Sequence, residues 1–371
     1  MHGTSTLAEA GRLMTVCNSC RYCEGLCAVF PAMEMRCAFT DGDLNYLANL
    51  CHSCGGCYTD CQFAPPHEFD VNVPKALALA RGESYAAYAW PRACAGLFAR
   101  NGLAIAMIAA LSVAAFIFGF AAYRDPAVLY GVHTGPGAFY KLMPHNAMAA
   151  LFGAAFLYAM VALTMGVRAF WRGIGEPIGA LGDPPALWQA MMDAGRLRYL
   201  DGGGVGCFNE DERPSDRRKI YHHLTFYGFG LCFASTSVAT LYHYLLAREA
   251  PYPWWDLPVV LGTLGGVGLL IGPAGLLAEK YKRDPALVAD TQLGMDVAFI
   301  VMLFLTGLTG LALLLLRDTA AMGMMLALHL GVVFALFITM PYGKFVHGIY
   351  RFVALVRYAA ERRRLESAQV G

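Results

Sequence analysis

Apolar residues dominate the chain after its first hundred positions, which are polar and rich in cysteine. Six apolar stretches, each long enough to cross a hydrocarbon core that needs about 20 helical residues, lie near 101–122, 145–170, 222–246, 258–278, 293–316 and 324–347. The pattern predicts a mainly α fold: an N-terminal domain at 1–95, then a six-helix transmembrane bundle at 96–371 with a polar loop at 171–221.

Composition places the chain in a lipid bilayer. Of its 371 residues 57% are hydrophobic and 15% charged, and the mean hydropathy is +0.46, which is too apolar for a soluble protein of this size. The fourth stretch is rich in glycine, which lets membrane helices approach closely, so we interpret its glycines as a packing face rather than a nucleotide loop. No nucleic-acid partner is expected.

Lysine and arginine gather in every second loop, although the formal net charge is only +1. They precede the third and fifth stretches and follow the sixth, and include Arg196, Arg198, Arg217, Arg218, Lys219, Lys280, Lys282, Arg283, Arg351, Arg357, Arg362, Arg363 and Arg364. By the positive-inside rule these loops are cytoplasmic. The N-terminal domain and the C-terminal tail are therefore both expected in the cytoplasm.

Eight of the twelve cysteines form two copies of one spacing, C-x2-C-x2-C-x3-C, which is typical of cubane iron–sulfur clusters. The fourth cysteine of each run usually ligates the other cluster. The spacing therefore predicts one [4Fe–4S] cluster on Cys17, Cys20, Cys23 and Cys61 and a second on Cys51, Cys54, Cys57 and Cys27. Zinc is the main alternative, but zinc sites normally use separated cysteine pairs. Disulfides belong to oxidising compartments, and no secretory signal precedes the first run.

Helical patterns surround the second cysteine run. Asp43 is placed to cap a helix in which Leu44, Leu47 and Leu50 recur at helical spacing, and a further helix is expected at 74–81, starting with a proline. We therefore predict a helical two-cluster ferredoxin domain. The other cysteines are interpreted as small packed residues: Cys37, Cys94, Cys207 and Cys232.

Histidines inside or beside the apolar stretches are candidate haem ligands, because an intramembrane ionisable group usually has a function. His329 and His347 are 18 residues apart, which is five turns of a continuous helix, so both would project from one face. Pairing by depth predicts His222 with His347 at the cytoplasmic level and His243 with His329 at the outer level. Each pair is a candidate bis-histidine site for a b-type haem, giving one or two haems. His145 competes for the outer site.

The polar loop carries no sign of a nucleotide site. Asp183 and the two prolines after it predict a short helix. The glycine-rich segment 201–207 is either a flexible loop or a docking surface, because no strand precedes it and Cys207 stands where a third glycine is needed. No flavin, nicotinamide or hydrolase site is evident, so no catalytic residues are predicted.

The cysteine runs, the stretch 211–229 and the six-span layout together resemble the tricarballylate (or citrate) utilisation protein B family. The membrane half is also similar to the cytochrome b subunits of respiratory nitrate and heterodisulfide reductases, whose histidines hold haem. The resemblance implies a protein of the bacterial inner membrane. It would reoxidise a soluble FAD-dependent tricarballylate dehydrogenase and pass electrons to the quinone pool.

Two other functions stay open at this point. The heterodisulfide reductase likeness allows the reverse direction, in which quinol feeds a cytoplasmic reductase. A non-catalytic membrane anchor or redox sensor would also carry clusters. In the leading hypothesis the cofactors supply the chemistry, and the chain is an electron-transfer subunit of an oxidoreductase.

Overall fold

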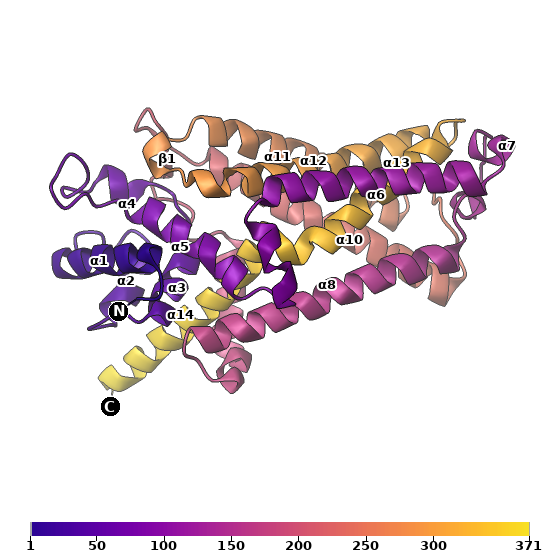
Figure 1. Ribbon diagram of the computed structural model, residues 1–371. Helices are drawn as coiled ribbons and strands as arrows, with labels where there is room; N and C mark the ends of the chain where they lie inside the picture. The colour runs from indigo at the N-terminus through magenta and orange to yellow at the C-terminus, as the bar shows by residue number, and fades with distance from the viewer. Residues whose placement is uncertain (1, 371) are drawn as a thin grey trace.

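The computed structural model describes residues 2–370, and the N-terminal helices gather at one end of a bundle of long helices (Figure 1). The N-terminal unit consists of α1 (Ser5–Cys20), α2 (Val29–Glu34), α3 (Asp41–Leu50), α4 (Gly56–Thr59) and α5 (Val73–Ala87). Fully buried apolar side chains from α1, α2, α3 and α5 form its core: Leu13, Met14, Phe30, Leu44, Leu47 and Leu77. The predicted helical ferredoxin-like domain is confirmed.

The start of α3 differs in detail from the prediction. Thr40, not Asp43, is the N-cap: its hydroxyl accepts a bond from the Asp43 amide, and the Asp43 carboxylate accepts one from the Thr40 amide. This reciprocal pair is a capping box, which satisfies two backbone donors at once. Helix α5 has Pro74 in its first turn, as expected, and Asn72 is its N-cap.

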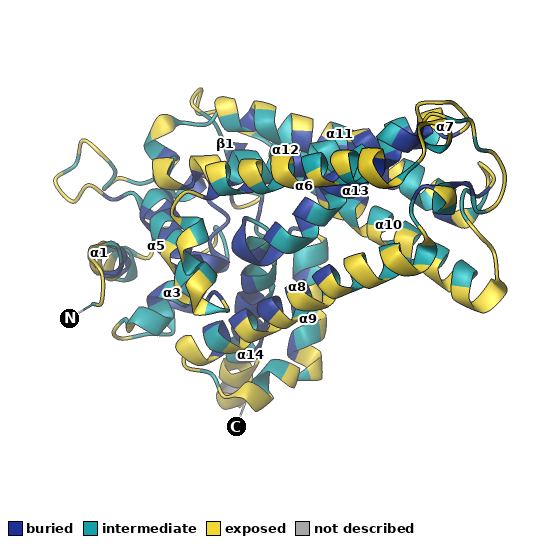
Figure 2. Ribbon diagram, turned by 45° about the vertical axis from the view of Figure 1, so that its right-hand side comes forward, coloured by how far each residue is buried: buried dark blue, intermediate teal, exposed yellow. Residues whose placement is uncertain are grey.

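Among residues 2–370, six helices are long and apolar enough to cross a membrane, which confirms the six-span prediction. They are α6 (Asn101–Tyr123), α8 (His145–Gly173), α10 (Arg217–Leu246), α11 (Leu257–Tyr281), α12 (Asp290–Leu316), and α13 (Met322–Thr339) extended by η5 (Met340–Tyr342). Exposed positions run along α6 and α8 in Figure 2, and many are large apolar residues such as Leu111, Phe118 and Leu157. These surfaces suit a hydrocarbon environment.

Glycines bring α10 and α11 into close contact. A Cβ atom at Gly228 would lie 3.0 Å from the carbonyl oxygen of Gly265, and one at Gly268 would lie 2.9 Å from that of Leu224. Neither position has room for a larger residue without a shift of backbone. The fourth apolar stretch is therefore a packing face, as its glycines indicated.

The sixth span ends earlier than the sequence pattern suggested. Pro341 lies in the turn η5, and an irregular segment at 343–345 separates it from α14 (Val346–Val370). Proline lacks the amide hydrogen needed to continue a helix. His347 therefore lies on α14 rather than α13, and the argument that His329 and His347 share one face of one helix is wrong.

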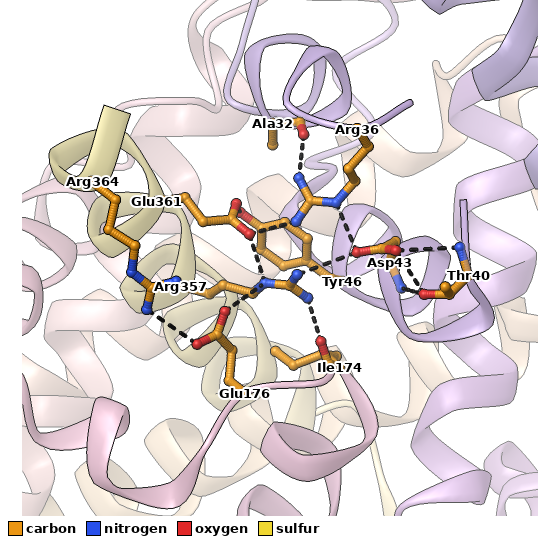
Figure 3. A network of polar contacts seen from close by, with 10 residues as sticks. All are labelled: Ala32, Arg36, Thr40, Asp43, Tyr46, Ile174, Glu176, Arg357, Glu361 and Arg364. Atoms are coloured by element: carbon orange, nitrogen blue, oxygen red, sulfur yellow. Dashed lines mark hydrogen bonds and ion pairs between the residues drawn. The ribbon is translucent and has the colours of Figure 1, made fainter. Parts of the chain in front are cut away.

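Helix α14 runs out of the bundle to the N-terminal domain, where it packs against α3 and against α9 (Pro184–Gly195) (Figure 1). Arg357 of α14 forms ion pairs with Asp43, Glu176 and Glu361, and Arg36 pairs with Asp43 and Glu361 (Figure 3). Burial alone would raise the pKa of Asp43, but hydrogen bonds from Thr40 and Arg36 outweigh it, so this pKa is below its usual value. The C-terminal helix is thus joined to the ferredoxin-like domain by charge as well as by packing.

Short elements connect these helices: η1 (Arg92–Phe98), α7 (Pro126–Leu129), η2 (Ala138–Lys141), η3 (Ile178–Gly182) and η4 (Pro285–Leu287). The helix predicted after Asp183 is α9, although the Asp183 carboxylate bonds to Arg363 instead of capping it. The glycine-rich segment leads into β1 (Cys207–Phe208), which pairs antiparallel with β2 (Pro214–Ser215). Gly203, Gly204 and Gly206 have φ of 82°, 100° and 113°, which only glycine adopts readily.

Candidate functional site

The first group of thiols lies at the end of the N-terminal domain. Cys17 and Cys20 stand on the last turn of α1, and Arg21, with φ of 56°, reverses the chain so that Cys23 returns beside them. Cys61 follows α4. All four cysteines line one open cavity, together with Tyr22, Gln62 and other residues. We call this group the first thiol site.

The second thiol site consists of Cys51, Cys54, Cys57 and Cys27. Gly55, with φ of 96°, turns the chain between Cys54 and the short helix α4 that carries Cys57. Burial raises the pKa of Cys27, and the neighbouring Cys54 and Cys51 raise it further. The structure thus brings three cysteines of each run together with the last cysteine of the other run. Cys57 also lines the first cavity, so the two sites are neighbours.

Thiolate sulfur is the ligand that holds iron–sulfur clusters in proteins. Among the described residues, no group of three or more metal-binding side chains is close enough to hold a single metal ion. Burial, followed by repulsion from neighbouring thiolates, raises the pKa of Cys17 and of Cys23 to about 12. Four thiolates in such a place need positive charge between them, which the irons of a cubane cluster would supply.

Four arginines converge on the backbone of the second thiol site. Their hydrogen bonds to the segment 51–53 are Arg81 Nη1 to Cys51 O at 2.6 Å, Arg351 Nη2 to Cys51 O at 2.7 Å, Arg218 Nη1 to Ser53 O at 2.7 Å and Arg283 Nη2 to Ser53 O at 2.9 Å. They come from α5, α14, α10 and the loop after α11. One cysteine loop is therefore held by the N-terminal domain and by three parts of the membrane half.

The glycine-rich segment covers this second site. The amide of Phe208 donates to the carbonyl of Cys54 at 2.9 Å, and a Cβ at Gly56 would lie 3.3 Å from the carbonyl oxygen of Gly202. Buried Cys207 packs with Cys54. The glycine-rich segment therefore shields one side of the second thiol site.

At the inner level of the bundle, His222 of α10 faces His347 of α14. Their ring centroids are 6.1 Å apart and the rings are nearly perpendicular. Nδ1 of His347 lies against the carbonyl of Lys344, while Nδ1 of His222 is buried without a partner. A backbone carbonyl on Nδ1 fixes the tautomer that leaves Nε2 free for a metal. Burial and Arg351 lower the pKa of His347, which favours the neutral imidazole that ligates iron.

At the outer level the structure replaces one predicted partner. His243 stacks on His145, with centroids 3.5 Å apart, and Nδ1 of each ring is buried without a partner. His329 instead makes a 2.9 Å hydrogen bond through Nδ1 with the Thr309 hydroxyl of α12. The structure therefore brings His243 beside His145 rather than beside His329, because His329 of α13 lies against α12. Imidazoles with unpartnered nitrogens are candidate ligands for haem iron, but the two stacked outer rings would have to separate before an iron atom could lie between them.

Sequence reasoning missed the four arginines at the second thiol site. Arg218, Arg283 and Arg351 were used only as signs of membrane orientation, and Arg81 was not singled out. A local signal exists for two of them: Arg218 precedes His222 by four residues, and Arg351 follows His347 by four. That spacing places each arginine one helical turn from a candidate ligand.

Fold and thiol sites together define a multi-span membrane protein with a ferredoxin-like domain. Residues 10–87 match the family model of the citrate utilization protein B Fer4-like domain, and residues 96–368 match that of citrate utilization protein B. A protein from Escherichia coli named citrate utilization protein B is 50% identical over 368 residues, covering 99% of this chain and 96% of the relative. The chain therefore belongs to the citrate utilization protein B family. No solved structure matches it.

Proposed function

We propose that this protein is a membrane-bound electron-transfer subunit used in the breakdown of citrate-like tricarboxylates. It takes electrons from a soluble FAD-dependent dehydrogenase of the tricarballylate type and delivers them to the membrane quinone pool. Two [4Fe–4S] clusters and b haem would supply the chemistry, since each accepts and releases single electrons. The chain supplies their ligands, their spacing and their electrostatic surroundings.

One observation carries this proposal: the second thiol site and the inner histidine pair are held by the same helical turns. Arg218 and Arg351 reach the backbone of residues 51–53, and His222 and His347 stand one turn further along the same helices. A redox group on the thiols and one between the imidazoles would therefore be neighbours. This adjacency supports a path from the ferredoxin-like domain into the bundle.

The first thiol site supports entry of electrons from a soluble partner. Its cavity is lined by Tyr22, whose side chain is 72% exposed, and by the exposed Gln62. Buried Cys51, in contrast, lies between the domain and the bundle. A partner can thus approach the first site without entering the membrane. The family resemblance favours a flavoprotein as that partner.

Orientation belongs to the same proposal. The basic loops put both termini and the ferredoxin-like domain on the cytoplasmic side of a bacterial inner membrane. The domain boundary falls near residues 95 and 96, between α5 and the first span, and the segment 171–221 is a cytoplasmic loop. Its glycine-rich part covers the second thiol site from that side.

The test is an anaerobic reconstitution. Purified full-length protein in lipid vesicles with a quinone would be mixed with a tricarballylate dehydrogenase whose FAD has been reduced by its substrate. We expect flavin absorbance to return together with quinol formation, and Cys20→Ser vesicles to lose most of this rate. Cys37→Ser is the matched control, because Cys37 is exposed and outside both runs.

Two results would favour the other functions. If quinol reduced the protein and the protein then reduced the flavoprotein, electron flow would run in the reverse direction. If fully loaded vesicles left the reduced flavin unchanged, a redox sensor or anchor would explain the chain better. A spectrum before and after dithionite would separately test for haem through its α and Soret bands.

A further inference from the structure

The arginines around Cys51 have no carboxylate to neutralise them. Within residues 2–370, Arg81, Arg218, Arg283 and Arg351 appear in no ion pair with aspartate or glutamate; each bonds to backbone carbonyls. Arg81 is 7% exposed and the other three are partly buried. Charges withdrawn from water normally need an opposite charge nearby.

The carboxylate of Asp296, which lies near Arg283, already has partners. Asp296 of α12 pairs with Lys280 at 2.6 Å and with Lys344 at 2.7 Å. The two lysines already neutralise the single negative charge of Asp296, so it does not balance the charge of the arginines. A guanidinium group stays protonated at neutral pH in proteins. The surplus positive charge is therefore permanent.

The first thiol site has different surroundings. The exposed carboxylate of Asp60 lies near Cys23, and Glu24 follows Cys23 in the chain. The exposed Arg21 donates to the carbonyl of Asn18 at 3.1 Å, and Arg12 pairs with Glu9 at 2.6 Å. The first site thus has an exposed carboxylate and exposed cations beside it, whereas the second has four withdrawn arginines without a carboxylate partner.

We infer that the four arginines are the counter-charge of the cluster on Cys51, Cys54, Cys57 and Cys27 and raise its reduction potential above that of the cluster on Cys17, Cys20, Cys23 and Cys61. A cubane bound by four thiolates is a net anion, and reduction adds one more negative charge, which nearby cations stabilise. The inference rests on the proposed function, and it sets a direction that the sequence left open.

The resulting step is a one-electron transfer. With clusters bound, the first would lose one electron and the second would gain it, and no bond or proton would be exchanged. Because the second site adjoins the bundle, the electron would move from the exposed face of the domain toward the membrane. The arginines therefore act on the second cluster through their charge. Their effect is measured as a change in its reduction potential and not only as a change in rate.

The experiment is a redox titration of purified full-length protein, followed by electron paramagnetic resonance without air. Signals are assigned by their loss in Cys20→Ser and in Cys54→Ser. We expect the second-site signal to appear at the higher potential. Arg81→Gln and Arg351→Gln should each lower that potential enough to change the reduction equilibrium about tenfold, which is ~59 mV for one electron. Arg81→Lys and Arg351→Lys, which keep the charge, should retain most of it.

Asp60→Asn provides the reciprocal test, since loss of its charge should raise only the first-site potential. Arg283→Gln is measured as well, in case one of the other variants fails to assemble its clusters. The inference is overturned if the wild-type first site has the higher potential, or if Arg→Gln variants with full iron and sulfide keep the second-site potential. Purified protein without iron and sulfide would instead refute the proposed function itself.

Discussion

The guanidinium of Arg351 donates a 2.7 Å hydrogen bond to the carbonyl oxygen of Cys51, and so joins the C-terminal helix to the cysteine loop of the N-terminal domain. Arg218 makes a bond of the same length from α10 to the carbonyl of Ser53. Both helices enter the bundle one turn beyond these contacts, at His347 and His222. Each arginine contact to the cysteine loop is therefore one helical turn from a histidine of the inner pair.

The fourth cysteine of each run is predicted to ligate the cluster of the other run, and two pairs of variants test this prediction. Cys61→Ser should abolish the same paramagnetic signal as Cys20→Ser, because both thiols line the first cavity and, in addition to burial, both raise the pKa of Cys17. Cys27→Ser should lose the same signal as Cys54→Ser, since burial raises the pKa of Cys27 and Cys54 and Cys51 lie close enough for their charges to raise it further. The measurement is the spectrum of dithionite-reduced protein with its iron and sulfide content. Cys61→Ser behaving like Cys54→Ser would disprove the exchange, and Cys37→Ser should change neither signal.

The inner histidines should act as one unit. His222→Ala and His347→Ala are each expected to remove the same haem, because a bis-histidine site loses an axial ligand in either variant. Haem content by pyridine haemochrome and the position of the α band would check this. His223→Ala is the matched control: this neighbour stacks near Tyr227 instead of facing His347. Full haem in His347→Ala would show that the pair is not a ligand set.

At the outer level, three histidine variants distinguish the two possible ligand sets. His145→Ala should lose as much haem as His243→Ala, while His329→Ala should keep its haem, since the 3.5 Å stack joins His145 to His243 and a hydrogen bond ties His329 to Thr309. Haem loss in His329→Ala with retention in His145→Ala would restore the pairing that the sequence suggested. The readout is again haem per protein.

Much of the architecture follows from local sequence rules. Hydrophobic stretches longer than about 20 residues leave few choices besides membrane helices. Likewise, the close spacing of the first three cysteines in each run determines which thiols lie near one another. These features depend on residues close together in the chain. The helices at Leu44 and Leu47 and after Pro74 were predictable for the same reason.

Tertiary contacts decided what the sequence could not. Helical spacing placed His329 and His347 on one face, but Pro341 and the segment 343–345 end the helix between them. The choice between His145 and His329 depends on how α8, α10 and α13 are arranged, which periodicity does not encode. The arginines come from four separate elements, so no local pattern could have grouped them around Cys51.

Arg357 is expected to hold the C-terminal helix against the domain. Its guanidinium pairs with Glu361 at 2.9 Å and with Asp43 at 3.2 Å, and lies 4.3 Å from the centre of the Tyr46 ring. Its side chain is only 10% exposed. Removing one partner of such a network leaves charges uncompensated, so Arg357→Ala should lower the free energy of unfolding of the domain by about 3 kcal/mol.

Arg362 gives the matched comparison on the same helix. It pairs with Glu366 at 3.5 Å, but the two side chains are 40% and 65% exposed, so water screens the pair. Arg362→Ala should therefore cost less than about 1 kcal/mol. Both variants would be unfolded with urea in detergent, with cluster absorbance reporting on the domain. Equal losses in the two variants would mean that packing of α14, rather than the charge network at Arg357, holds this helix in place.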